Sequence, residues 1–306
     1  MEVNNLLFFV FVIGIGFFFR KFKLVPESAA DSLPAILINI CYPAMILQTF
    51  TTTDLKTLLE TGLPVVIGTL AVTLTLFFGS ILVFRRVSAD RRALLQFITG
   101  IGNVTYVAIP LMSVFLPEEM LFVAILHGSV QDLLIWTIYH QLFVGEETGK
   151  FSTKLKKIIS NPCLIAVLAG VVLMVFQIRL PSFLQLAISK LNAATSPLAL
   201  LFLGMLIHRY GLFSWKADKI AMVYSAGKVI VLPVVIALVL RLFMSVETAI
   251  CLGFLFGSPA PLTSVVWSRQ YGKDDKLAVN CCISSTFLFL VVMSIALLVL
   301  TGSGVL

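Results

Sequence analysis

The chain has 306 residues, of which 59% are hydrophobic and only 12% are charged, and its formal net charge is +7. This composition excludes an ordinary soluble globular domain. Because charge-free runs recur from one end of the chain to the other, no room remains for a separate soluble domain. Five cysteines lie in apolar runs without the CxxC spacing of metal or redox sites, so we interpret them as packing residues. We therefore expect an all-α membrane protein.

The charge-free or nearly charge-free runs predict ten membrane-spanning helices. The first run has neither a basic segment before it nor an A-x-A cleavage pattern after it, so we expect a retained span and not a signal peptide. The predicted spans cover residues 4–19, 32–50, 62–84, 93–116 and 120–144 in the first half, and 159–177, 184–207, 220–240, 248–268 and 277–300 in the second.

The basic residues predict the orientation. Seventeen of the 22 lysines and arginines fall in alternate loops, four fall in the opposite loops, and Lys228 lies inside the eighth span. The positive-inside rule places the seventeen in the cytoplasm, so both termini are expected to be extracytoplasmic in a multi-pass protein of the inner or plasma membrane. The positive charge is thus explained by topology and gives no support to nucleic-acid binding.

Ten spans divide into five and five, and an odd number makes the second half enter the membrane in the opposite sense, as an inverted repeat. The prolines agree with this division, since Pro43 of the second span has a counterpart in Pro197 of the seventh, and Pro110 of the fourth in Pro259 or Pro261 of the ninth. The expected units are a first repeat at 1–145, a basic cytoplasmic linker at 146–158 and a second repeat at 159–306.

The fourth and ninth spans carry residues that interrupt helices. Glycine and proline recur within both of them, and proline removes a backbone donor and clashes with the preceding turn. Such a break survives in a membrane only against protein or a watery cavity. Two broken spans in corresponding positions of two halves are typical of a transporter's binding site. The interrupting residues are Gly100, Gly102, Asn103, Thr105 and Pro110 in the fourth span and Gly257, Ser258, Pro259 and Pro261 in the ninth.

A broken helix offers a site for an anion, because the free N–H groups of a half-helix carry roughly +0.5 of partial charge. Asn103 adds two donors and an acceptor, which suit a carboxylate, although it could instead only satisfy the freed backbone. No catalytic residue is expected. The candidate substrate-binding residues are Asn103, Thr105, Pro110, Ser258, Pro259 and Thr263, together with Asn39 and Asn192, for which helix packing is an alternative.

Two ionisable residues lie within predicted spans and require partners or water there. Asp132 is a candidate for proton coupling, and the alternative is a structural tie to Lys228 or to a backbone group. His127 is interpreted as a packed polar residue more readily than as a coupling site.

The two broken spans resemble those of one known family. Asn103 followed seven residues later by Pro110 resembles the fourth-span signature of the auxin efflux carriers. The later residues are also similar to that family's pattern: Lys228 with Pro233, Ser258-Pro259, Tyr271-Gly272-x-Asp274, Ala278 and Ser284-Ser285-Thr286. The resemblance covers the whole chain.

The resemblance implies that the broken fourth and ninth spans cross at mid-membrane. It implies a scaffold of spans 1, 2, 6 and 7, a moving transport domain of spans 3–5 and 8–10, and elevator-type export of small organic anions such as auxin or other carboxylates. The chain departs from the pattern in its short central loop, in Thr105 where glycine is expected, and in Thr263 where asparagine is expected. Membrane lipid and a homodimer formed through the scaffold helices are the further expected partners.

Other function classes are disfavoured. No GxxxxGK[ST] loop, HExxH or GxSxG is present, so ATP-driven transport by this chain and intramembrane hydrolysis have no motif, and no cofactor or metal is expected. A channel stays open as an alternative, because broken helices also build selectivity filters. A sodium-coupled symporter of the bile-acid type is the other alternative, although neither broken span (93–117 and 248–268) contains an acidic residue that could serve the cation.

Overall fold

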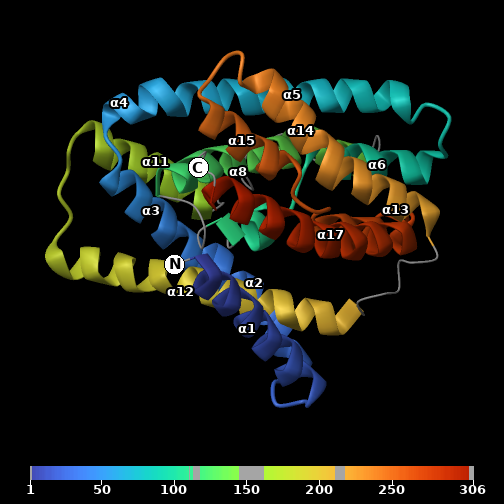
Figure 1. Cartoon of the computed structure of the whole chain (residues 1–306), viewed down its shortest axis with the longest axis horizontal. Coiled ribbons are helices and arrows are strands. Elements are labelled where there is room, and N and C mark those ends of the chain that lie inside the picture. The colour runs from blue at the N-terminus through green and yellow to red at the C-terminus, as the bar shows by residue number, and fades with distance from the viewer. Residues whose placement is uncertain (1, 110, 113–117, 145–161, 211–217, 303–306) are drawn as a thin grey trace.

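The computed structural model describes residues 2–109, 111–112, 118–144, 162–210 and 218–302, and this part of the chain is helical without any strand (Figure 1). The predicted linker 146–158 and Pro110 lie outside the described residues. The helices of the first half are α1 (Glu2–Lys21), α2 (Glu27–Ile36), η1 (Leu37–Cys41), α3 (Tyr42–Thr52), α4 (Leu55–Thr57), η2 (Leu58–Gly62), α5 (Leu63–Val83), α6 (Ala89–Gly100), η3 (Val104–Ala108), α8 (Glu118–Leu134), η4 (Ile135–Tyr139) and α9 (His140–Val144). Those of the second half are α11 (Pro162–Val175), α12 (Ser182–Tyr210), α13 (Lys219–Ala226), η6 (Gly227–Val231), α14 (Leu232–Leu240), α15 (Val246–Phe256), α16 (Leu262–Gln270) and α17 (Asp275–Gly302).

Several of these helices are suited to a bilayer. Within the described part of the chain, five continuous helical stretches are long and apolar enough to cross a membrane, and α11 and α15 are shorter apolar helices. Helical residues lie in each of the ten predicted segments, and the fourth and ninth segments are interrupted as their glycines and prolines predict. The five stretches are Leu55–Val83, Glu119–Phe143, Ser182–Arg209, Lys219–Leu240 and Asp275–Val292.

Wide π-helical turns precede several prolines. The segments η1, η2 and η6 each end two residues before a proline, namely Pro43, Pro64 and Pro233. A proline inside a helix donates no hydrogen bond and its ring clashes with the carbonyl four residues earlier. That carbonyl lies within the π segment in each case, so one wider turn accommodates the proline without ending the helix.

The helices pack as two groups. In the α12 group, α1 and α3 pack on α12, and α11 packs on α3. The contact between α1 and α12 is close, because a Cβ added to Gly16 would lie 2.1 Å from the carbonyl oxygen of Leu201. In the crossover group, α5 packs on α6 and α8, α14 packs on α15, and α17 packs on α13 and α16. Figure 1 shows α5 along one edge of the molecule and α12, crossed by α1, along the opposite edge.

Polar groups gather at one end of the crossover group. Arg91, near the start of α6, bonds Asp274, just before α17, with 2.7 Å between Nε and Oδ2. Asp218 caps α13 by accepting the N–H groups of Ile220 and Ala221, each at 3.1 Å. Burial alone would raise the pKa of Asp218, but the hydrogen bond from Asn280, the capping N–H groups and nearby Arg91 together lower it.

All five cysteines are buried and unbridged, which confirms their interpretation as packing residues.

Candidate functional site

The two interruptions touch each other. α6 ends at Gly100 and α15 ends at Phe256, and the chain between each of these helices and the next helical segment is irregular. The backbone N–H of Asn103 donates to the carbonyl oxygen of Pro259 at 2.7 Å. A Cβ added to Gly102 would lie 1.9 Å from Ser258 Oγ, so a larger residue there would force the Ser258 side chain or the crossing to shift. The fourth and ninth segments therefore cross with their main chains in direct contact.

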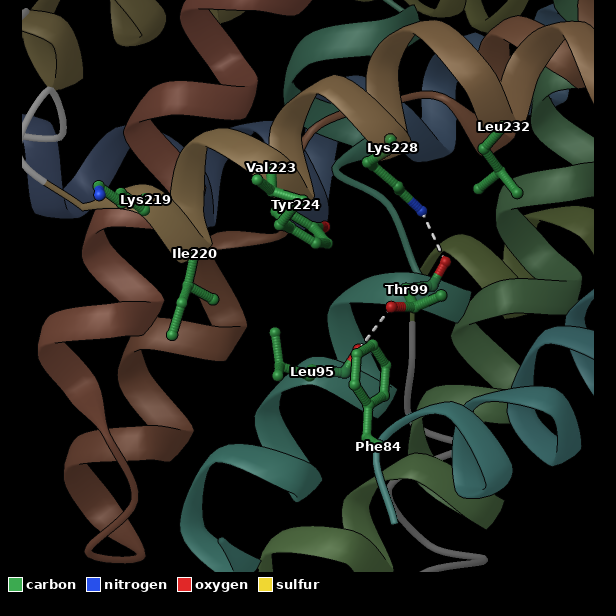
Figure 2. Close-up of a pocket in the computed structure, with 10 residues that line it drawn as sticks. Phe84, Leu95, Thr99, Lys219, Ile220, Val223, Tyr224, Lys228 and Leu232 are labelled. Atoms are coloured by element: carbon green, nitrogen blue, oxygen red, sulfur yellow. Dashed lines mark hydrogen bonds between the residues drawn. The ribbon is translucent and has the colours of Figure 1, made fainter. Parts of the chain in front are cut away.

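The first interruption is held by long side chains from neighbouring helices. Gln131 of α8 accepts the N–H of Gly102 and donates to the carbonyl of Gly100, both at 3.2 Å. The Lys228 ammonium of η6 donates to the carbonyl of Thr99 at 2.9 Å (Figure 2). These carbonyls lie in the last turn of α6, where no intrahelical donor reaches them. The bonds thus replace those that an unbroken helix would make.

The second interruption is held by smaller groups of α17. Ser285 Oγ accepts the N–H of Ala260 at 3.0 Å, and Cys282 Sγ lies 3.4 Å from the carbonyl oxygen of the same residue. Ser258 is buried, and its hydroxyl donates to the carbonyl of Leu255 at 2.6 Å. The two prolines of this segment have no N–H, so fewer donors need partners here.

Several donors at the crossing stay unused within the described part of the chain. The side chain of Asn103 is only 5% exposed, yet its amide makes no hydrogen bond there. The N–H groups of Val104 and Thr105, which open η3, and those of Leu262 and Thr263, which open α16, also make none. Unpaired N–H groups at helix starts carry positive partial charge. The crossing can therefore stabilise a negatively charged group.

Two basic side chains lie close to the crossing, and the acid Asp132 lies beside Thr105 in the cavity described below. Lys228 is 3% exposed, and its ammonium bonds the carbonyl of the residue four positions before Asn103. His127 is fully buried and its Nδ1 lies 3.1 Å from Thr69 Oγ1, while its Nε2 has no partner among the described residues. The ring of His127 packs edge-on against Phe256, the last residue of α15, at 4.7 Å between centroids.

A small cavity lies where the two helix groups meet. It encloses about 30 Å³, and Tyr42 and Cys163 of the α12 group line it together with Thr105 and Asp132 of the crossover group. The Tyr42 hydroxyl donates to the carbonyl of Thr105, which directly joins α3 to the segment that follows the first interruption. Asp132 thus faces the boundary between the groups, whereas Lys228 bonds the backbone of α6.

Comparison with known proteins decides the family. The model of a family described as "Membrane transport protein" matches residues 2–153 and 150–297. The chain belongs to this family, the auxin efflux carriers. This transporter is also 26% identical, over 95% of its own length and 97% of the relative's, to an uncharacterized transporter from Methanocaldococcus jannaschii. The family and the apolar helices together make it a multi-pass membrane protein.

The structure places the other predicted residues of the transporter as follows. Thr263 is half-buried in the first turn of α16. Asn39 is exposed and its amide donates at 2.8 Å to the carbonyl of Ala35 on its own helical stretch, and Asn192 lies half-buried on α12. Pro110 lies outside the described residues, although η3 ends two positions before it, as π segments do before the other prolines.

The sequence reasoning missed Gln131 and underrated Ser285, which together hold the two interruptions. The sequence does carry a sign of the role of Gln131, because a polar amide in an apolar span, directly before Asp132, needs hydrogen-bond partners inside the protein. Ser285 entered the sequence analysis only as part of the Ser284-Ser285-Thr286 run that resembles the family, and it was given no role of its own. The Tyr271-Gly272-x-Asp274 motif is structural, because Gly272 has a φ of +62° and Asp274 accepts the N–H of Leu277 at the start of α17.

Proposed function

We propose that this transporter is a secondary carrier that moves small organic anions, such as carboxylates, by alternating access. The observation that carries the proposal is the contact between the two interruptions, which brings the unused N–H groups of two half-helices and the Asn103 amide to one place. A carboxylate there would be held by partial charges and hydrogen bonds without a direct ion pair.

The charge of the surroundings supports an anion over a cation. Lys228 adds a buried amine near the crossing, and the interrupted segments themselves contain no acidic side chain. The acid Asp132, which lines the cavity with Thr105, belongs to α8 and is assigned a separate role below. Asn103 can donate two hydrogen bonds, and its amide has no partner to give up within the described residues. An incoming carboxylate would therefore gain donors without breaking existing bonds of that side chain.

We propose that the crossover group moves against the α12 group. The close contact of α1 with α12 at Gly16 supports a rigid unit. In the described part of the chain the boundary is largely apolar, with Phe50 of α3 packed edge-on against Phe122 of α8, and the Tyr42–Thr105 bond lies beside the small cavity; non-directional apolar contacts of this kind are suited to sliding. Movement along that boundary would carry Asn103 from one side of the membrane to the other while the crossing stays intact.

The same proposal includes ten spans in two inverted repeats, with both termini extracytoplasmic. The helices at all ten predicted segments and the alternation of basic loops support it. The first residues of α5 and α14, which are the third spans of the two halves, also share the sequence Leu-Pro-Val-Val-Ile at 63–67 and 232–236, each after a π segment.

Replacing Asn103 by alanine tests the proposal. Losing a hydrogen bond to a charged group costs about 1.5–3 kcal/mol, so affinity for the transported anion should fall roughly ten- to a hundredfold. A thermal-shift screen of the purified parent against mono- and dicarboxylates first identifies a ligand. Gln185→Ala is the matched control, because Gln185 is exposed and its amide donates to the carbonyl of Leu180, away from the crossing. Undiminished affinity in Asn103→Ala would remove the crossing as the site.

We further propose that a proton on Asp132 accompanies the movement, since its carboxyl group faces the boundary between the groups. Asp132→Asn should then abolish uptake driven by a pH gradient and preserve exchange of substrate for substrate in proteoliposomes. Retention of both activities would assign Asp132 a structural role.

A further inference from the structure

A second and larger cavity lies inside the crossover group, away from the boundary with α12. It is a groove of about 510 Å³ between the corner that joins α5 to α6 and the stretch from α13 to α14. Phe84 and Leu95 form one wall and Ile220 and Val223 the other, as Figure 2 shows, and Lys228 lies toward the inner end. None of the unused donors at the crossing belongs to this groove.

The wall of the groove is almost entirely apolar. Four of its residues have polar ends, and three of these are engaged elsewhere: the Lys228 ammonium bonds the carbonyl of Thr99, the Tyr224 hydroxyl donates at 2.8 Å to the carbonyl of Ile98, and the Thr99 hydroxyl donates at 2.6 Å to the carbonyl of Leu95. The fourth, Lys219, lies at the outer end. The parts of the Lys228 and Tyr224 side chains left to line the groove are a methylene stem and a ring. Such a wall fits hydrocarbon and offers little to a small polar acid.

The groove is open at its side and basic at its outer end. Val223 is 74% exposed, and on a membrane-spanning helix this surface faces lipid. Lys219 is exposed at the outer end, and Arg85 and Arg86 directly follow Phe84 and are also exposed. Within the described residues, the side chains of these three cations form no ion pair, and the neighbouring acid, Asp218, is occupied by Asn280 and the N–H groups that it caps.

We propose that the groove binds an anionic phospholipid from the leaflet that meets the start of α13. Its phosphate pairs with Lys219 and the Arg85–Arg86 pair, and one acyl chain lies between the two walls. Lys219 and Lys228 are nine residues apart, so the groove extends about 13.5 Å along the helix, close to the thickness of one hydrocarbon leaflet of about 15 Å. Basic pockets between helices at a membrane surface are suited to anionic headgroups.

The bound chain would act on the crossing from outside. It covers the side of α6 whose last carbonyls bond Lys228 and Tyr224, and it excludes water from both bonds. Hydrogen bonds of this kind are stronger in a low-dielectric surrounding. The lipid therefore stabilises the broken α6 in its present position.

The test compares phosphatidylglycerol with phosphatidylcholine of the same chains, added to the purified full chain in detergent. We expect phosphatidylglycerol to raise the melting temperature by about 5 °C, and native mass spectrometry to show one tightly retained copy. Lys219→Gln should lose at least half of this shift. Lys190→Gln, which removes an exposed lysine from α12, should keep it. Val223→Trp, which fills the groove, should lose both the shift and the retained copy.

Three results would overturn the proposal. An equal response to phosphatidylcholine would show that no anionic headgroup is recognised. A full response to phosphatidylglycerol in both Lys219→Gln and Val223→Trp would place the lipid elsewhere. Stabilisation by a free fatty acid but not by phosphatidylglycerol would assign the groove to an amphipathic acid. Because the readouts are lipid binding and melting, they stand apart from the binding test on Asn103.

Discussion

The two interruptions at the crossing solve the same problem with different residues. The first, in the fourth segment, depends on glycines at 100 and 102, which keep their N–H groups, whereas the second depends on Pro259 and Pro261, which have none. A break at glycine leaves donors and acceptors to be satisfied, and a break at proline leaves mainly acceptors. The first interruption accordingly needs both halves of the Gln131 amide as well as a lysine, and the second needs one serine and one thiol.

The difference indicates a division of roles. Lys228 brings an ionisable amine to the first interruption, while Ser285 brings only a neutral hydroxyl to the second. The first therefore contributes to the electrostatics of the proposed site, and the second mainly to its geometry. Substitutions on the two sides should separate these contributions.

The largest effect is expected where the interruptions touch. Gly102→Ala would place a methyl group 1.9 Å from the buried Ser258 Oγ and 3.3 Å from the carbonyl oxygen of Leu255. The Ser258 side chain or the crossing must then shift, and we expect impaired transport together with a destabilisation of about 1–3 kcal/mol. The double variant Gly102→Ala/Ser258→Ala should recover part of the stability, measured as melting temperature. Gly79→Ala is the control, since a Cβ there meets nothing within 4 Å and should stabilise α5 by about 0.5–1 kcal/mol. Wild-type melting and transport in Gly102→Ala would contradict the close crossing.

The next effect should separate affinity from stability. A cation about 8 Å from a bound anion contributes about 2 kcal/mol at an effective dielectric constant of about 20, so Lys228→Met should weaken anion binding roughly thirtyfold. Its melting temperature should stay near that of the parent, because removing the buried charge offsets the lost bond to Thr99. Titration calorimetry with the ligand identified by thermal shift measures the first quantity, with Lys190→Met as the control. Unchanged affinity would remove Lys228 from the electrostatics of the site.

The smallest effect is expected at the second interruption, where folding stability should fall and anion affinity should not. Ser285→Ala leaves the buried N–H of Ala260 without its acceptor, which costs about 1–3 kcal/mol of folding stability, and anion affinity should be preserved. Thr75→Ala is the control, because its exposed hydroxyl bonds the carbonyl of Ala71 within α5. An affinity loss in Ser285→Ala as large as that in Lys228→Met would abolish the distinction between the two interruptions.

Much of the fold could be predicted because its signals are local. Charge-free runs mark the helices, and the Gly100–Pro110 and Gly257–Pro261 stretches mark the interruptions, since glycine and proline act on the backbone where they stand. That the two interruptions cross came from a family resemblance, because no local property of either stretch specifies its partner.

The partners of the polar side chains could not be predicted in the same way. Asp132 and Lys228 are both ionisable residues of apolar spans, and their opposite charges made a mutual tie one of the natural expectations. The structure instead directs Lys228 to the carbonyl of Thr99 and Asp132 to the boundary with α3 and α11. Such choices depend on which helix faces which, and the wide turn at η6 changes the direction in which Lys228 points.

The bond between the N–H of Asn103 and the carbonyl of Pro259 joins two main-chain atoms, and this has a consequence for divergence within the family. Every amino acid offers the carbonyl, and every one except proline offers the N–H. This bond is therefore inherited with the path of the chain, and the side chains of Asn103 and Pro259 themselves take no part in it. On the function proposed above, a lineage that stands at 26% identity to its relative can change its cargo by replacing residues such as Asn103 or Thr263 and keep the path of the chain.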